Sequence, residues 1–199
     1  MMINNCKTIF DYTPINTHSV LAKYLKVYPV KLKISKRRFS KYGDYKKYID
    51  GSEQISINSN LSPFRFLITL IHEFSHLFAY KEYGDNIKPH GIEWKQTYKK
   101  LMMPFLNLSI FPEEILCALK KHFINPKASS DSDLNLVMAL NNHDLNKKLY
   151  VYNIPEGNFF KIYNGRIFKK GPKLRKRYKC EEKFSGKKYL FNPLTEVVL

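Results

Sequence analysis

The chain has 199 residues, and its 34 Lys and Arg against 17 Asp and Glu give a formal net charge of +17 at pH 7. Hydrophobic residues make up 44% and aromatic residues 15%, a composition that excludes a disordered or fibrous protein. No apolar stretch approaches the roughly 18 continuous residues of a membrane span, and the N-terminus lacks the features of a secretory signal. We therefore expect a soluble, cytoplasmic protein with no membrane partner, built as one globular domain with a small appendage.

The cysteines are few and widely separated. Cys6, Cys117 and Cys180 form no CxxC pair, which argues against a disulfide framework and against a cysteine-ligated zinc site. We expect three reduced and mostly buried thiols.

The first part of the chain predicts a mixture of helix and strand. Apolar residues at helical spacing favour an amphipathic helix over residues 15–27. Apolar and polar residues then alternate over residues 30–34 and again over residues 55–57, which is typical of half-buried strands. We expect these strands to form a small antiparallel sheet.

A long apolar helix is predicted next. Ser62 suits the N-cap and Pro63 the first helical position, and the apolar run continues until Gly84 supplies a C-terminal stop. Two further helices are expected, one from about residue 91 to residue 102 and one that begins at Pro112 with acidic residues in its first turn.

The long predicted helix carries His72-Glu73-Phe74-Ser75-His76, an HExxH motif. Its four-residue spacing places both imidazoles on one helix face, where they can reach one zinc ion at roughly 2.0–2.1 Å. Glu73 then lies beside the open metal position and can act as a general base towards a water molecule. With this composition the motif is expected by chance only about 0.01 times in such a chain.

The alternative is that His72 and His76 are satisfied core histidines, because the residues around them are strongly apolar. Burying two imidazoles and a carboxylate costs free energy unless something pairs with them. We therefore favour one bound Zn²⁺ per chain.

A catalytic zinc site needs a third protein ligand, and the downstream candidates are Glu82, Asp85, His90 and Glu93. The metzincin spacing requires His at position 82, where this chain has Glu, so that class is excluded. Glu93 is the gluzincin-like alternative. We favour His90, because a histidine at the turn Pro89-His90-Gly91 can swing over the preceding helix and is a common zinc donor.

Beyond this region the chain becomes polar and then strand-like. Residues 125–135, NPKASSDSDLN, predict a linker or long loop, and a short helix is expected around residues 134–140. After residue 149, aromatic and β-branched residues alternate with Gly turns, and Asn164-Gly165 predicts a hairpin between FFKIY and RIF.

Positive charge is concentrated in this last part. Residues 161–188 hold 12 Lys and Arg against 2 Glu, a net of +10, whereas residues 1–160 carry 22 against 14, a net of +8. This excess indicates contact with a polyanion, and a solvated lysine-rich surface is the alternative. The candidate residues for binding DNA or RNA, without sequence preference, are Arg166, Lys169, Lys170, Lys173, Arg175, Lys176, Arg177 and Lys179.

The pairing of HEFSH with the later His90-Gly91-Ile92-Glu93-Trp94 resembles the SprT-like metallopeptidase family, in which an HGxxW-type segment completes the zinc site. Arg38, Gly43 and the strand EQISINSNL resemble the sheet of the same family, and the resemblance covers about residues 10–125. It implies an α+β, zincin-like minimal metallopeptidase fold with His72, His76 and His90 as zinc ligands and Glu73 as general base. Trp94 itself is interpreted as a core residue, because Trp94 and Tyr98 are apolar residues at the spacing of one helix face.

The chain also departs from that family. Many relatives carry a C-terminal zinc ribbon with two Cys pairs, whereas the corresponding region here retains only Cys180. The resemblance therefore implies a ribbon-like β module without metal ligands. Relatives of the Spartan type cleave proteins crosslinked to DNA, which implies that substrate class by analogy.

These patterns together predict three regions: a metallopeptidase domain over residues 1–125, a linker and short helix over 126–148, and a basic β module over 149–199. The expected function is that of a zinc-dependent endopeptidase with a protein substrate. The alternative is a nucleic-acid-binding protein whose zinc site is not catalytic and whose working part is the basic module.

Overall fold

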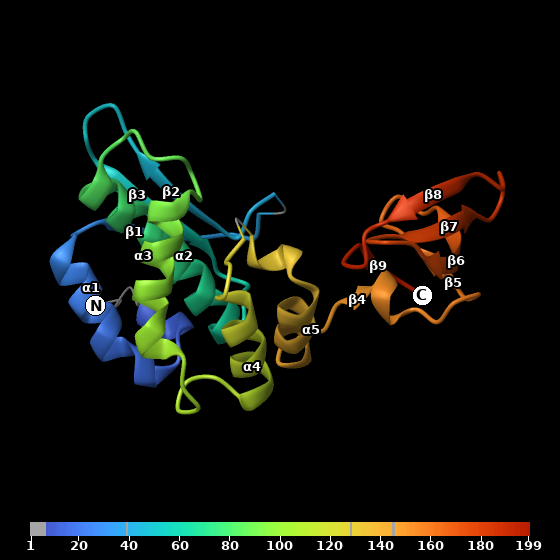
Figure 1. The fold of residues 1–199 in the computed structure, drawn as a ribbon, viewed down its shortest axis with the longest axis horizontal. Helices are drawn as coiled ribbons and strands as arrows, with labels where there is room; N and C mark the ends of the chain where they lie inside the picture. Colours follow the sequence, from blue (N-terminus) through green and yellow to red (C-terminus); the bar gives the residue numbers. More distant parts are fainter. Residues whose placement is uncertain (1–6, 39, 128, 145) are drawn as a thin grey trace, which may run out of the picture. The chain divides into compact units, whose positions relative to one another are not determined.

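The computed structural model describes residues 7–38, 40–127, 129–144 and 146–199. The chain forms two compact units, Met1–Asp144 and Leu145–Leu199, whose elements are labelled in Figure 1. None of the described helices combines the length and the apolar character needed to cross a membrane.

The sheet of the first unit has three strands, β1 (Lys31–Ser35), β2 (Gly43–Lys47) and β3 (Glu53–Asn58), in the order β1-β3-β2. β3 runs antiparallel to β2 but parallel to β1. The expectation of an antiparallel sheet is therefore wrong for β1. Alternating apolar residues identify a strand, but its direction depends on the path of the connecting loop.

The connection from β1 to β2 is held against β3 by one arginine. Arg38 donates from Nε to Asn58 Oδ1 at 2.8 Å and from Nη1 to Ser56 Oγ at 2.9 Å. Asn58 in turn donates to the backbone carbonyl oxygens of Arg38 and Lys41. These contacts tie the connection to β3, and β2 pairs on the edge of β3 opposite β1.

The helices of the first unit follow the predicted pattern closely. The long helix α2 begins at Pro63 and ends at Tyr83, between Ser62 and a Gly84 with φ of 79°. The first predicted helix is split, because residues 15–17 form a 3-10 turn before the α-helix begins at His18. The α-helices are α1 (His18–Val27), α2 (Pro63–Tyr83), α3 (Ile92–Met102), α4 (Glu113–His122) and α5 (Leu134–Asn142), with 3-10 turns at Ile9–Tyr12, Ile15–Thr17, Met103–Phe105 and Ser130–Ser132.

The core of the first unit is centred on α2. This helix contacts β2 and β3 as well as α3, and α2 and α3 lie next to each other in Figure 1. Because neighbours cover it on several sides, Phe66, Leu70, Ile71 and Phe74 are all fully buried. Polar groups on such a helix need partners, since burial without one is costly.

The segment expected to be a linker belongs to the first unit. α5 packs on α4, and Leu136, Ala139 and Leu140 are part of the same hydrophobic core as α2. The division between the units falls after residue 144, inside the region 126–148 that was expected to be a linker and short helix. The apolar face of α5 explains the difference, because burying it against α4 ties the polar residues before it to the domain.

The second unit is a β module with its own small core. β4 (Leu149–Tyr150) pairs with β9 (Glu196–Val197), and a 3-10 turn covers Val151–Asn153. A four-stranded antiparallel sheet contains β5 (Phe159–Lys161), β6 (Ile167–Lys173), β7 (Tyr178–Glu182) and β8 (Lys188–Phe191) in that order. The hairpin predicted at Asn164-Gly165 joins β5 to β6, and Gly165 has φ of 86° as its turn requires.

The two described cysteines are free thiols. Cys180 is buried in the core of the second unit, whereas Cys117 is exposed on α4, so the expectation of burial fails for Cys117. Cys6 lies outside the described residues.

Candidate metal centre

Three histidine side chains meet beside α2. His72 and His76 lie one turn apart on that helix, and His90 comes from the turn between α2 and α3. Their Nε2 atoms form a nearly equilateral triangle, with 3.2 Å between His72 and His76, 3.1 Å between His76 and His90, and 3.2 Å between His90 and His72. This cluster could hold a metal ion.

The protonation of these rings suits a cation. Burial lowers the pKa of His72 to about 3, assisted by the neighbouring His76 and His90. Burial likewise lowers the pKa of His76 to about 4 and lowers that of His90. Three neutral imidazoles whose Nε2 atoms face one another cannot satisfy all three by mutual hydrogen bonds, since each Nε2 carries either one proton or one lone pair. A shared cation satisfies all three lone pairs.

His90 reaches this position through an unusual backbone conformation. Its φ is 58°, and it is the only residue other than glycine with a positive φ in the part of the chain that the structure describes. The turn is closed by a hydrogen bond from the Gly91 N–H to the Lys88 carbonyl, and a Cβ at position 91 would lie 2.9 Å from that oxygen. Left-handed backbone in a non-glycine residue costs free energy and concentrates at functional sites.

Trp94 backs the whole cluster. Its indole is 1% exposed, and its ring centroid lies 4.7 Å from that of His72, 5.3 Å from His76 and 4.6 Å from His90. Tyr98 packs against Trp94, and the ring centroids of Tyr98 and His72 are 5.5 Å apart. The interpretation of Trp94 as a core residue is confirmed, and the structure adds that this part of the core restricts the three imidazoles.

Glu73 is a buried carboxylate next to the first histidine. Glu73 is 6% exposed, and burial, together with the nearby Asp44, raises the pKa of its carboxyl group to about 8. The backbone N–H of Tyr45 donates to it and opposes that rise. Gly43 at the start of β2 makes room for this carboxylate, because a Cβ there would lie 2.5 Å from Glu73 Oε1 and 2.6 Å from Thr69 Cγ2.

His72 and Glu73 line a cleft of about 440 Å³. One side of the cleft is formed by the chain leading into β2, and another by the segment before α5. Its lining residues are Ser40, Lys41, Tyr42, Gly43, Thr69, His72, Glu73, Ser129, Ser130 and Asp131. Sequence reasoning did not foresee the contribution of residues 129–131, which carry no motif of their own.

The other acidic candidates for the third ligand are not part of the cluster. Among the described residues, the group of side chains able to hold a metal consists of His72, His76 and His90. Asp85 instead lies 3.7 Å from the Lys47 ammonium. The structure therefore places His90 with the helix histidines and leaves Glu82, Asp85 and Glu93 outside.

The basic residues of the second unit are distributed over several environments. Arg175, Lys176 and Arg177 are exposed in the turn between β6 and β7, which the Leu174 N–H closes by donating to the Arg177 carbonyl. Lys169, Lys173 and Lys179 are exposed on the strands. Arg166 is half-buried, with its guanidinium 4.6 Å from the ring centroid of Tyr189 and 5.0 Å from that of Phe168.

Lys170 is a correction to the predicted nucleic-acid-binding set. It is 6% exposed, its ammonium donates to the carbonyl oxygens of Tyr152 and Ile154, and it lies 4.0 Å from the ring centroid of Tyr178. Strand alternation explains this, because Lys170 follows the buried Phe168 by two residues and so shares its inward face. The same alternation, read from the sequence, would have revealed it.

The first unit is thus a mixed α and β domain with a three-histidine cluster that could hold a metal. Residues 17–112 match the model of the SprT-like family. This match is consistent with a metallopeptidase-like function. No curated protein and no solved structure matches the chain.

Proposed function

We propose that this protein is a zinc-dependent endopeptidase of SprT-like type, with a zincin-like fold in its first unit. The observation that carries the proposal is the convergence of three imidazole nitrogens beside a buried carboxylate at a cleft. A site that only stabilises the fold has no need of an open cleft or of a base next to the ion.

The donor set fits zinc. Tetrahedral zinc with bonds of about 2.0–2.1 Å separates its nitrogen ligands by about 3.3 Å, and the three Nε2 separations are 3.1, 3.2 and 3.2 Å. Three histidines leave one position for water or substrate, which is the arrangement of catalytic zinc sites.

The residues of the chain then divide the chemistry between them. A zinc ion, when bound, supplies Lewis acidity that lowers the pKa of a water molecule and polarises a carbonyl oxygen. Glu73 takes a proton from the attacking water as the water oxygen bonds to the carbonyl carbon. It then delivers that proton to the amine nitrogen, which leaves as the peptide C–N bond breaks. Gly43 keeps the space that this carboxylate occupies, and Trp94 holds the histidine rings in place.

The test compares wild type with Glu73→Gln on casein and on peptide pools, with and without DNA. Glutamine has nearly the same shape but cannot accept the proton, so activity should fall by about 10²- to 10⁴-fold while the zinc content stays at one equivalent. Glu113→Gln, the same substitution at an exposed position of α4, is the control and should retain activity. A zinc-loaded wild type that cleaves no protein or peptide would favour the alternative, a nucleic-acid-binding protein with a non-catalytic zinc site.

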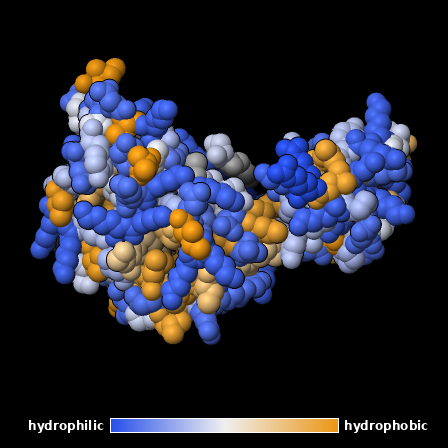
Figure 2. Space-filling view, in the orientation of Figure 1, coloured by the Kyte–Doolittle hydropathy of each residue, from blue (hydrophilic) through white to orange (hydrophobic). Residues whose placement is uncertain are grey.

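We also propose that the second unit binds DNA or RNA through phosphates, which would direct the peptidase to DNA-associated or DNA-crosslinked proteins. Residues 161–188 carry 12 Lys and Arg against 2 Glu. All of these residues are described, and Lys170 is the one cation among them that the fold buries. Figure 2 shows mostly hydrophilic residues on the visible face of this unit, interrupted by a hydrophobic patch. Polyanion binding of this kind depends on charge density and not on a base-reading motif.

Exposed aromatic rings accompany this charge. Phe159 and Phe184 are 48% and 79% exposed, and the Lys183 ammonium lies 5.6 and 5.7 Å from their ring centroids. Rings that are accessible between cations suit base stacking in single strands. Fluorescence anisotropy with labelled single- and double-stranded oligonucleotides, measured over a salt series, tests the proposal. Salt-independent binding would mean that the charge is a solvated surface.

A further inference from the structure

One side of the cleft comes from a part of the chain outside the family match. The match ends at residue 112, whereas Ser129, Ser130 and Asp131 line the cleft together with His72 and Glu73. Residues 40–43, which also line the cleft, lie within the match. The cleft therefore has lining residues both inside and outside the matched part of the chain.

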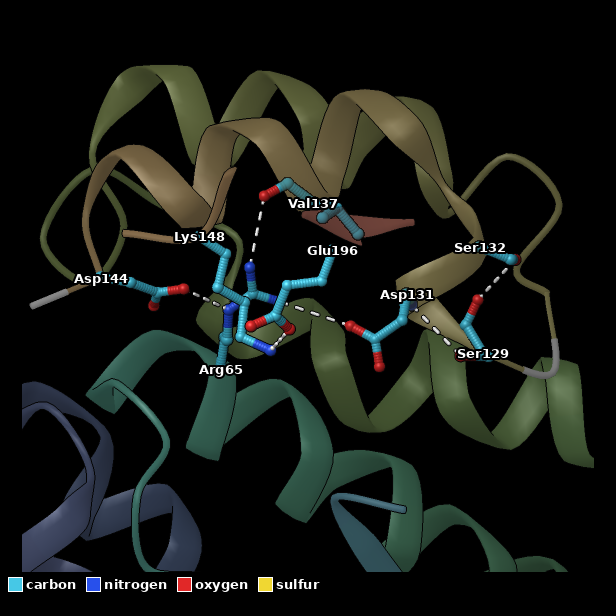
Figure 3. A network of polar contacts seen from close by, with 8 residues as sticks. All are labelled: Arg65, Ser129, Asp131, Ser132, Val137, Asp144, Lys148 and Glu196. Carbon is cyan, nitrogen blue, oxygen red and sulfur yellow. Dashed lines mark hydrogen bonds and ion pairs between the residues drawn. The ribbon is translucent and has the colours of Figure 1, made fainter. Parts of the chain in front are cut away.

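A single buried arginine ties this segment to the helix of the histidines. Arg65 precedes His72 by seven residues, about two helical turns, so both lie on the same face of α2. It donates from Nε to Asp144 Oδ2 at 2.7 Å, from Nη1 to Asp131 Oδ1 at 3.3 Å and from Nη2 to the Val137 carbonyl at 3.3 Å. Figure 3 shows Arg65 with these three partners.

The three partners span the segment from end to end. Asp131 lies in the 3-10 turn Ser130–Ser132, Val137 in the middle of α5, and Asp144 just beyond the end of α5. Arg65 is 6% exposed, and a buried guanidinium keeps its charge only where carboxylates and carbonyls satisfy it. Its planar fork has the geometry to reach three acceptors at once, which the single ammonium of lysine lacks.

We propose that Arg65 is a positioning residue for peptide cleavage: it holds residues 129–131 as the second wall of the substrate cleft. This rests on the proposed peptidase function. Arg65 touches none of the groups assigned to the chemistry, so its effect is on the binding of the polypeptide substrate and not on the water or the metal. The wall contributes through Asp131 and the two serines, which line the cleft together with Lys41 and Gly43.

The test uses a fluorogenic peptide that wild type cleaves, with KM and kcat measured separately. Arg65→Lys keeps the charge but loses the planar guanidinium with its several donors. It should raise KM by about 10-fold, the size expected for loss of a charge-assisted hydrogen bond. Both kcat and the zinc content should change little. Asp131→Asn changes an exposed partner, is less demanding on folding, and should raise KM in the same direction.

Asp133→Asn is the matched control. Asp133 lies two residues further on, caps α5 through the Leu136 N–H and pairs with His122 at 3.0 Å, but it does not line the cleft. It should lower the melting temperature and leave KM unchanged. In hydrogen exchange, Arg65→Lys should speed exchange of the amides of residues 129–137 and leave those of β3 as in wild type.

The outcomes separate the two proposals. Cleavage by wild type with an unchanged KM in Arg65→Lys and Asp131→Asn overturns the role of the wall and leaves the peptidase in place. A fall in kcat together with a loss of zinc in Arg65→Lys also overturns the role of the wall, because Arg65 would then act through the histidines. An equal rise of KM in Asp133→Asn would reduce the effect to general destabilisation. Absence of any cleavage by zinc-loaded wild type overturns the proposed function itself.

Discussion

In the first unit the side chains of the candidate functional site are few and buried. In the second unit the candidate binding side chains are many and mostly exposed. Glu73 and Arg65 are each 6% exposed, and the rings of three histidines pack on one fully buried indole. Residues 146–199 instead carry 14 Lys and Arg against 4 Glu, a net of +10 on 54 residues. The first unit carries 20 against 13 over residues 1–144, a net of +7.

This difference determines how each unit responds to mutation. A buried site relies on geometry that neighbouring side chains enforce, so one misplaced group removes most of its function. A charged surface acts through the sum of its charges, so each substitution subtracts a small and similar amount. Substitutions in the two units should therefore differ in the size of their effects and in whether those effects add.

The largest effect is expected for loss of the third histidine. His90→Ala should weaken zinc binding by more than about 100-fold, because even outer partners of metal ligands contribute 10- to 100-fold. Glu93→Ala, at the position of the alternative ligand, should bind zinc as wild type does. Elemental analysis and competition with a chelator measure both. Normal zinc binding by His90→Ala with loss in Glu93→Ala would show that the third ligand is misassigned.

A methyl group placed against the Glu73 carboxylate should come next. Gly43→Ala adds a Cβ 2.5 Å from Glu73 Oε1, which must displace that oxygen, and a displacement of about 1 Å can cost about 100-fold in rate. Zinc content should not change, because the nearest atoms to a Cβ at position 43 belong to Glu73 and Thr69 and not to a histidine. Lys46→Ala, exposed on the same strand, is the control for the strand itself. Full activity in Gly43→Ala would show that the position of Glu73 is not critical.

The buried lysine offers a test within the second unit. Lys170→Met removes an ammonium that satisfies two backbone carbonyls, and leaving such acceptors unpaired costs about 1–3 kcal/mol. Its exposed neighbour Lys169→Met should change stability by no more than about 0.5 kcal/mol. Thermal or urea unfolding of the two variants distinguishes them. The reverse order of stabilities would mean that the inward position of Lys170 is not stabilising.

The smallest change for each residue is expected at the turn between β6 and β7. A quadruple Arg175/Lys176/Arg177/Lys179→Ala variant should reduce the slope of log affinity against log salt by up to about 0.7–0.9 for each phosphate that these side chains neutralise. Lys170→Met should leave that slope unchanged, because its ammonium is directed at backbone carbonyls and not at solvent. An unchanged slope in the quadruple variant would place nucleic-acid binding elsewhere or nowhere on this unit.

Local patterns were sufficient to predict much of the fold and the centre of the site. Ser62, Pro63 and Gly84 mark the ends of α2, Asn164-Gly165 marks the β5–β6 turn, and a four-residue spacing places His72 beside His76. Each of these depends on residues within about one helical turn or one hairpin loop, where backbone geometry alone sets which groups meet.

Tertiary structure decided the remaining features, because they join residues far apart in the chain. β1 pairs in parallel with the distant strand β3, and Arg38 bonds to residues 18 and 20 positions later. Arg65 bonds to partners 66 to 79 positions away, in the segment that supplies lining residues of the cleft, and no local pattern encodes that meeting. The sequence by itself determined which side chains could perform the chemistry. Which of them share a cleft was decided by the packing of α2 against the sheet, α3 and the segment before α5. Burial of apolar faces brings those distant elements together.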